Sequence, residues 1–285
     1  MRYDFHAHTH YSDGILSPAQ LVTRAHGKGV ELLAISDHDS ISGIAEAKDI
    51  VCSEELSLTV IEAIELSAQS DFGEIHIVGL NIDSDNLDLI ALTKQQQQKR
   101  WSRVEEMELK FKKLNVEGVL VDLRANCKQV VTRSHVARSL IKLGYVKDNN
   151  QAFKKYMGKK GRVKVSTDWV TMEQAVSIIQ GAEGLAILAH PTRYPMSNRR
   201  LGYLIEEFQI AGGDAIELSY PSISPDKMGW LEVQRSKNNL LASGGSDFHY
   251  PDLKWSDLGR FPRIRDDIPH VLNSIKEKIQ ADAAR

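Results

Sequence analysis

Short apolar runs alternate with amphipathic stretches in the first and last thirds of the chain. Runs of Leu, Ile, Val and Ala that stop after a few residues are typical of buried strands, whereas apolar residues spaced three and four apart are typical of helices. The predicted strands cover residues 3–5, 32–35, 58–66, 74–80, 185–188, 215–218 and 240–242. The repeated strand–helix order predicts an α/β fold built on a parallel sheet or barrel.

Two of the predicted helices begin with a serine followed by a proline, at Ser17-Pro18 and Ser224-Pro225. A serine hydroxyl accepts hydrogen bonds from the free N–H groups of the first turn, and proline fits the first helical position. The predicted helices cover residues 18–27, 43–51, 85–114, 172–180, 201–211 and 225–237.

The middle of the chain differs from both ends. Between residues 115 and 164 the strand–helix alternation stops, and a basic run appears at Lys154, Lys155, Lys159, Lys160, Arg162 and Lys164. Such a run is usually a solvated surface. It is also compatible with an inserted lid that places cations over a pocket. We therefore predict a barrel made of residues 1–99 and 166–285, with a small, mainly helical domain inserted at residues 100–165.

The composition indicates a chain that can bury a large core, since 42% of its 285 residues are hydrophobic and 26% are charged. A net charge of −2 argues against binding long duplex nucleic acid by charge alone, but allows a small anionic substrate. No run approaches the roughly 20 apolar residues that span a membrane, and no obligate protein partner is evident. Two isolated cysteines and no signal-peptide pattern lead us to expect a cytoplasmic location.

Histidine and acidic clusters recur at the ends of the apolar runs. His6 and His8 are two residues apart, which on a strand turns both imidazoles to one face, and Asp247 and His249 repeat this spacing. In a β/α barrel the strand ends form the active face. Because thiolates are absent from these clusters, the ligand types favour Mn, Fe or Zn over Mg or Ca. The remaining candidate ligands are Asp13, His38, Glu65, His76 and His190.

Glu65 closes a strongly apolar run, where a buried carboxylate without a partner is costly. Its two oxygens can bridge two cations, as in multinuclear sites that activate water. For two other candidates, a structural role is the alternative to metal binding. Asp13 lies in a Ser-Asp-Gly sequence that is also typical of a turn, and His76 could be a hydrogen-bonded strand histidine. We expect Asp37 to accept a hydrogen bond that fixes the tautomer of a ligand histidine.

Taken together, these clusters resemble the polymerase and histidinol phosphatase (PHP) family along nearly the whole chain. The matching segments are His6 to Gly14 with the pattern HxHTxxSDG, Ser36-Asp37-His38-Asp39, Ile64-Glu65-Leu66-Ser67, His76-Ile77-Val78-Gly79, Ala189-His190-Pro191 and Gly245-Ser246-Asp247-Phe248-His249. Thr132 to Ala137 is similar to the TRxHxA segment of a bacterial branch with an inserted domain. Members of that branch act as nucleoside 3′,5′-bisphosphate phosphatases and as 5′-to-3′ exonucleases on short RNA.

The resemblance implies a distorted (β/α)7 TIM-like barrel that holds three divalent transition-metal ions, with Mn as the first choice and Fe or Zn as alternatives. Carried over residue by residue, it assigns three ligand groups: His6, His8, Glu65 and Asp247; Glu65, His76 and His190; Asp13, His38 and His249. His6, His8, Glu65 and Asp247 are thereby expected to take part in catalysis.

The expected activity is hydrolysis of phosphate esters in a small nucleotide or short RNA. Arg133 and Arg193 are candidates for gripping phosphate, because a guanidinium binds it through two hydrogen bonds, and surface solvation is their alternative. His135 is a candidate for substrate contact or proton donation, and Lys159 and Arg162 are further candidates for substrate binding. A histidinol-phosphate type phosphatase, a carbon–nitrogen hydrolase on a related barrel and a non-catalytic nucleotide-binding module stay open as alternatives.

Overall fold

A computed structural model of the protein describes residues 1–127, 129–158, 160–252 and 256–283. Within these residues, seven strands follow one another in the sheet in the order β1-β2-β3-β4-β6-β7-β8, and β5 pairs with β3 at the side. The strands are β1 (Tyr3–Asp4), β2 (Leu32–Ile35), β3 (Thr59–Ser70), β4 (Gly73–Leu80), β5 (Val170–Thr171), β6 (Leu185–Leu188), β7 (Ala215–Ser219) and β8 (Leu241–Gly244).

One strand departs from the parallel sheet that the sequence predicts. β4 runs antiparallel to both β3 and β6, whereas the β1–β2, β2–β3, β6–β7 and β7–β8 pairs are parallel. The cause is the connection between β3 and β4, which consists of Asp71 and Phe72 alone. A parallel pair needs a crossover of a dozen residues or more, and a link of two residues therefore forces a hairpin. This hairpin distorts the barrel.

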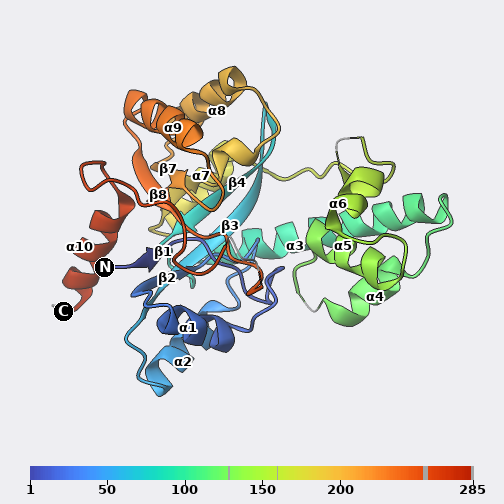
Figure 1. Ribbon diagram of the computed structural model, residues 1–285, viewed down its shortest axis with the longest axis horizontal. Helices are drawn as coiled ribbons and strands as arrows, with labels where there is room; N and C mark the ends of the chain where they lie inside the picture. Colours follow the sequence, from blue (N-terminus) through green and yellow to red (C-terminus); the bar gives the residue numbers. More distant parts are fainter. Residues whose placement is uncertain (128, 159, 253–255, 284–285) are drawn as a thin grey trace.

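The sheet curls until its first and last strands meet, which gives the nearly closed barrel that the sequence predicts (Figure 1). Beyond β1 and β8, Ala7 forms a parallel bridge with Phe248, and the His8 N–H donates to the Phe248 carbonyl at 2.9 Å. The buried Asp4 carboxylate accepts the N–H groups of Ser246 and Gly259, each at 2.8 Å. The barrel is therefore closed next to the sequence segments that carry its histidines.

The helices lie around the sheet and at one side of it (Figure 1). Ser17 and Ser224 cap α1 and α9 as predicted, and α10 is a helix that the sequence pattern did not predict. No helix among the described residues is both long and apolar enough to cross a membrane. The helices are α1 (Pro18–Gly27), α2 (Ile44–Ser53), α3 (Leu87–Lys112), α4 (Val119–Asn126), α5 (Arg133–Lys142), α6 (Asn149–Ala152), α7 (Met172–Gly181), α8 (Asn198–Ile210), α9 (Pro225–Lys237) and α10 (Val271–Ala283), with a π-helical turn at Phe153–Met157 and a 3₁₀ turn at Pro191–Arg193.

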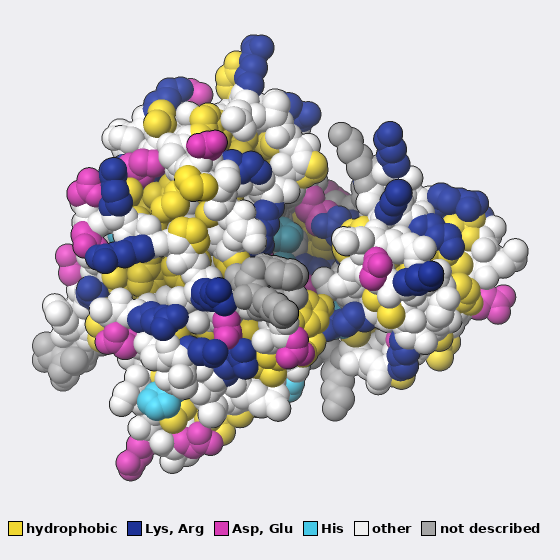
Figure 2. All heavy atoms as spheres, viewed as in Figure 1, with side chains coloured by type: hydrophobic (Ala, Val, Ile, Leu, Met, Phe, Trp, Pro, Cys, Tyr) yellow, Lys and Arg dark blue, Asp and Glu magenta, His cyan; other side chains and the backbone are white. Residues whose placement is uncertain are grey.

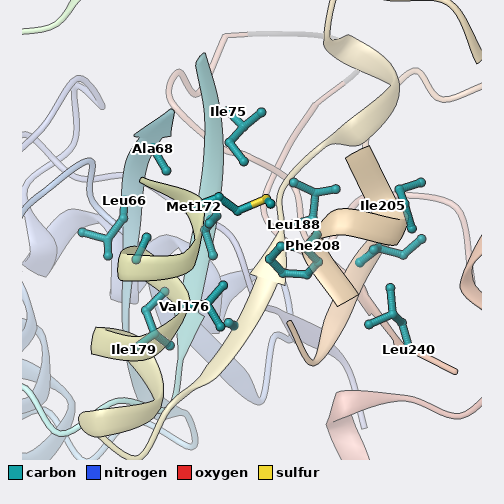
Figure 3. Packing of buried hydrophobic residues seen from close by; sticks show 14 of the residues in the cluster. Leu66, Ala68, Ile75, Met172, Val176, Ile179, Leu188, Ile205, Phe208 and Leu240 are labelled. Carbon is teal, nitrogen blue, oxygen red and sulfur yellow. The ribbon is translucent and has the colours of Figure 1, made fainter. Parts of the chain in front are cut away.

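Strand β3 divides its side chains between two environments. Leu66 and Ala68 belong to a buried cluster with Val176 and Ile179 of α7, and Figure 3 shows these side chains packed together with residues of β6 and α8. Because successive residues of a strand point to opposite faces, Glu65 points away from this cluster and toward the mouth of the barrel. The alternation of side chains along β3 thus places the fully buried Glu65 carboxylate at the centre of the molecule.

A second hydrophobic cluster lies apart from the barrel. Helix α3 contributes Leu89 and Leu92 to the barrel core, whereas its later residues Val104, Met107 and Phe111 pack with residues of α4, α5 and the segment up to Val165. Figure 1 shows this lobe beside the barrel, joined to it by α3. The predicted boundary at residue 100 falls inside α3, and the division into two domains stays a prediction.

Candidate metal centre

His6 and His8 follow β1 and are fully buried. Their Nε2 atoms lie 3.1 Å apart, as expected for residues two apart on an extended segment. Asp247, beyond β8, places Oδ1 3.5 Å from His6 Nε2 and 3.2 Å from His8 Nε2. Two imidazoles and a carboxylate from opposite ends of the chain therefore share one point, held together by the closure of the barrel.

Glu65 of β3 lies at the centre of the cluster. Its Oε1 is 2.9 Å from His76 Nδ1 and 3.0 Å from His190 Nε2. Its Oε2 is 2.8 Å from His38 Nδ1 and 3.4 Å from the Nε2 atoms of both His6 and His8. One carboxylate thus contacts five imidazoles, which is the arrangement expected of a group that bridges cations.

Asp13, His38 and His249 extend the cluster on one side. Asp13 Oδ1 is 3.1 Å from His249 Nε2 and 3.8 Å from His38 Nε2. The structure therefore brings together all nine residues for which the sequence predicts metal binding, and their roles as ligands stay predictions. They are His6, His8, Asp13, His38, Glu65, His76, His190, Asp247 and His249.

The unpaired atoms of this cluster fit divalent cations. Asp13 Oδ1, Glu65 Oε2 and His38 Nδ1 are buried, and among the described residues none has a hydrogen-bond partner. The 2.8 Å approach of Glu65 Oε2 to His38 Nδ1 therefore lacks hydrogen-bond geometry. Buried polar atoms are rarely left without partners. The cluster contains three overlapping groups of candidate ligands, and within each group the ligand atoms lie within 4.8 Å of one another. The cluster is therefore able to bind metal.

The cluster also sets the charge of its members. Burial would raise the pKa of Glu65, but the neighbouring charges of His38, His76 and His6 outweigh it and hold this pKa well below its usual range. Burial and the charges of His249 and His38 lower the pKa of His8 to about 3. The carboxylate is therefore ionised and the imidazole of His8 neutral at pH 7, the forms in which both bind metals.

Glu217 on β7 contacts two candidate ligands and was not singled out from the sequence. Its Oε1 accepts the Nδ1–H of His6 at 2.6 Å, and its Oε2 accepts the backbone N–H of His190 at 2.6 Å. It lies in a short apolar run, so the signal that singled out Glu65 was present. Among the described residues, the Asp37 carboxylate accepts from Thr9 and Ser12 and makes no hydrogen bond to a candidate ligand histidine itself. The Ser12 hydroxyl in turn lies 3.4 Å from His8 Nδ1, so the expected influence of Asp37 on a ligand tautomer stays a prediction that would act through Ser12.

Two residues of the cluster have a strained backbone conformation. His190 and Asp247 have φ of 31° and 48°, in the left-handed region that non-glycine residues occupy rarely and mostly where function requires it. Gly245 lies so close to β1 that a Cβ there would be 2.4 Å from the His6 Cβ. The absence of a side chain at residue 245 is therefore what lets β8 end against His6.

The cluster opens into a cavity of about 900 Å³ between the barrel and the second lobe. Figure 2 shows histidine at the bottom of this hollow, with Lys and Arg around it. Of the predicted substrate-binding residues, Arg133 and Arg193 line the cavity. Arg133 pairs with Glu74 at 3.3 Å, and Arg193 forms an ion pair with Asp247. Arg162 is exposed and does not line the cavity, and Lys159 lies outside the described residues.

His135 stands at the start of α5, where its Nδ1 accepts the Thr132 N–H at 3.2 Å. Thr132 in turn donates its hydroxyl to Asp13 Oδ2 at 3.0 Å, which ties the second lobe to the histidine cluster. Burial, and next the charge of Arg138, lower the pKa of His135 to about 4. The side chain is therefore neutral at pH 7 and carries its proton on Nε2.

A family model described as the PHP domain matches residues 4–157. The chain belongs to this family. A Haemophilus influenzae relative named 5′-3′ exoribonuclease is 37% identical to this PHP protein over 91% of the chain and 93% of that protein. A Chromobacterium violaceum relative named 3′,5′-nucleoside bisphosphate phosphatase is 34% identical over 99% and 98% of the two chains. A solved structure from Chromobacterium violaceum, described as an amidohydrolase with bound SO4, has a TM-score of 0.90 and 32% identity, covering 97% and 96%.

Proposed function

We propose that this PHP protein is a metal-dependent phosphoesterase that hydrolyses nucleotide phosphate esters. Its substrates are nucleoside 3′,5′-bisphosphates, which yield a nucleoside monophosphate and phosphate, and short 5′-phosphorylated RNA. The observation that carries the proposal is Glu65 Oε2, a buried carboxylate oxygen that lacks a hydrogen-bond partner among the described residues although it lies among three imidazoles. The names of the relatives from Haemophilus influenzae and Chromobacterium violaceum support the substrate class.

Three divalent ions, with Mn as the first choice, are proposed at the groups that the family resemblance implies: His6, His8, Glu65 and Asp247; Glu65, His76 and His190; Asp13, His38 and His249. The atoms that lie close enough to share an ion fall into partly different groups, which are His8, Asp13, His38 and His249; His6, His8 and Asp247; His38, Glu65 and His76. Bound there, such ions supply Lewis-acid stabilisation of charge on phosphoryl oxygens. The chain's own contribution is to bring the nine candidate ligands together in a buried, preorganised site, with Glu65 ionised and His8 neutral at pH 7.

Arginines at the mouth of the barrel orient the substrate. Arg193 lies over the Tyr220 ring at 5.2 Å and next to Asp247, so its guanidinium can bind the phosphate that reacts. Arg133, on the second lobe, is placed to bind the other phosphate. A pKa of about 4 makes His135 a poor proton donor at pH 7. His135 itself does not line the cavity, although its neighbours Thr132 and Arg133 do, so substrate contact by its Nε2–H stays a prediction.

The second lobe, residues 100–165, is proposed as the domain that covers the substrate. The hydrogen bond from Thr132 to Asp13 and the hydrophobic cluster separate from the barrel core support this role. A cytoplasmic location, expected from the isolated cysteines, and the absence of an obligate protein partner stay predictions.

The test is a phosphate-release assay on the Mn-loaded protein with adenosine 3′,5′-bisphosphate, a 5′-phosphorylated ribohexamer and histidinol phosphate. We expect release from the first two, and loss of release together with loss of bound metal in Glu65→Gln. Phosphate release from histidinol phosphate alone would indicate a PHP phosphatase of the histidinol-phosphate type. Hydrolysis of amides or lactams without phosphate release would establish the carbon–nitrogen alternative, and absence of both metal and turnover would establish a binding module.

A further inference from the structure

The cations that line the cavity fall into two classes. Four arginines face carboxylates: Arg100 pairs with Asp39, Arg103 and Arg133 pair with Glu74, and Arg193 pairs with Asp247. Among the described residues, the side chains of Arg200 and Lys164 line the same cavity without a carboxylate partner. These two cations are therefore the ones whose charge is not already neutralised by the protein.

Arg200 is held in place by an aromatic ring. Its guanidinium lies over the Phe72 ring at 5.5 Å from the centroid, and Phe72 is itself packed against the barrel core. The pair presents a flat guanidinium and a neighbouring aromatic surface at the wall of the cavity. Arginine planes and aromatic rings are the surfaces on which unpaired nucleobases stack, and the guanidinium also binds phosphate.

Helix stability does not explain this charge. Arg199 and Arg200 lie in the first turn of α8. This first turn contains no acidic residue. The positive end of the helix dipole disfavours cations there. A positive charge in an unfavourable position, exposed on a cavity that contains a candidate metal centre, is better explained by an anionic ligand.

The position of the pair indicates which part of a ligand it meets. Phe72 forms the tip of the β3–β4 hairpin, and His76 of the metal cluster is four residues along β4. At about 3.3 Å per residue, the tip lies roughly 13 Å from His76. This separation exceeds the distance between the 3′ and 5′ oxygens of a single ribose. The tip therefore lies beyond the second phosphate of a bisphosphate bound at the cluster, and the next nucleotide of an oligonucleotide would reach it.

We propose that Arg200 and Phe72, with Lys164 on the facing lobe, form a subsite for a nucleotide next to the one whose phosphate is hydrolysed. The ligand class is a short single-stranded oligoribonucleotide, whose base stacks on the pair and whose phosphodiester meets the two cations. This subsite rests on the proposed function and extends it, because it assigns residues to the part of an oligonucleotide that a bisphosphate lacks.

The test compares Arg200→Ala and Phe72→Leu with the wild type and with Arg199→Ala. Arg199 is the matched control, because it is the adjacent exposed arginine, contacts Tyr203 and does not line the cavity. We expect Arg200→Ala and Phe72→Leu to raise KM for a 5′-phosphorylated ribohexamer about 10-fold, in keeping with one lost stacking contact. KM for adenosine 3′,5′-bisphosphate should change less than 2-fold, and Arg199→Ala should change neither.

The subsite would be overturned if Arg199→Ala and Arg200→Ala changed KM for the ribohexamer equally, or if Arg200→Ala left it unchanged. A parallel rise in KM for the bisphosphate would overturn it as well. A wild-type protein without turnover on either substrate would contradict the proposed function instead. In that case the fluorescence anisotropy of a labelled ribohexamer still decides the subsite. Binding about 10-fold weaker in Arg200→Ala than in Arg199→Ala supports it, and equal dissociation constants overturn it.

Discussion

The Nδ1 atom of His6 lies 2.6 Å from Oε1 of Glu217, and this contact leaves the Nε2 atom of His6 facing Glu65 and Asp247. Because the other oxygen of Glu217 accepts the backbone N–H of His190 at 2.6 Å, one carboxylate contacts the ring of one candidate ligand and the backbone of another. A carboxylate that accepts the ring N–H of a ligand histidine, as Glu217 does for His6, fixes the ring and raises its basicity.

Glu217→Gln is therefore expected to weaken metal binding by about 10- to 100-fold. Glutamine has one acceptor oxygen where glutamate has two, so either His6 or His190 loses its partner. The measurement is metal content after dialysis against a graded chelator. Glu232→Gln, which removes a carboxylate paired with Arg235 on α9, is the control and should retain metal like the wild type. Equal metal retention by both variants would contradict the role of Glu217.

The sequence predicted the centre of the site better than its surroundings. His6, His8, Glu65 and Asp247 follow short apolar runs, and since strand ends of a barrel meet at one face, order along the chain was enough to bring them together. Glu217 carried the same signal as Glu65 but stands outside the matched motifs. The Arg200–Phe72 pair could not be predicted, because it depends on how α8 lies against a hairpin tip. The antiparallel β4 was missed because the apolar pattern of a strand is independent of its direction.

Arg100 joins α3 to the barrel through a buried ion pair. Its Nη2 is 2.6 Å from Asp39 Oδ2 and 2.7 Å from Ser67 Oγ, and Asp39 is fully buried. Arg100→Met leaves this carboxylate without its cation, so the free energy of unfolding should fall by about 3–5 kcal/mol. Urea unfolding measures the change.

Arg124→Met is the control for that measurement. Arg124 pairs with Glu105 where both side chains are more than half exposed, at 57% and 51%, and such pairs contribute about 0–1 kcal/mol. Similar urea midpoints for the two variants would mean that the Arg100–Asp39 pair does not hold the lobe to the barrel.

Gly245 is expected to be irreplaceable for the metal centre. A Cβ at this position would lie 2.4 Å from His6 Cβ and 2.6 Å from the His6 backbone N. Gly245→Ala should therefore push the ends of β1 and β8 apart, lower stability by roughly 1–3 kcal/mol and reduce bound metal. Gly229→Ala, in α9 with no atom within 4 Å of the added carbon, should be neutral or stabilising by up to about 1 kcal/mol. Thermal unfolding and metal analysis distinguish these outcomes, and an unchanged metal content in Gly245→Ala would contradict the close-approach argument.

His270 makes stability depend on pH independently of the metal centre. Its Nδ1 accepts the Leu272 N–H at 2.8 Å, and its Nε2 contacts the Tyr3 hydroxyl at 2.8 Å, so a proton added to Nδ1 breaks the first contact. Burial, and next the charge of Lys276, lower the pKa of His270 from 6.5 to about 4. Between these values the unfolded chain binds a proton that the folded protein does not, so the stabilisation present above pH 6.5 is lost as the pH falls toward 4.

The loss amounts to roughly 3 kcal/mol. Urea unfolding at pH 7.5 and pH 4.5 should show a larger decrease for the wild type than for His270→Gln, which has no titrating ring, and acid release of metal is common to both proteins. His26→Gln, at an exposed position of α1, should follow the wild type. If His270→Gln lost as much stability on acidification as the wild type, the buried imidazole would not be the source of the acid sensitivity.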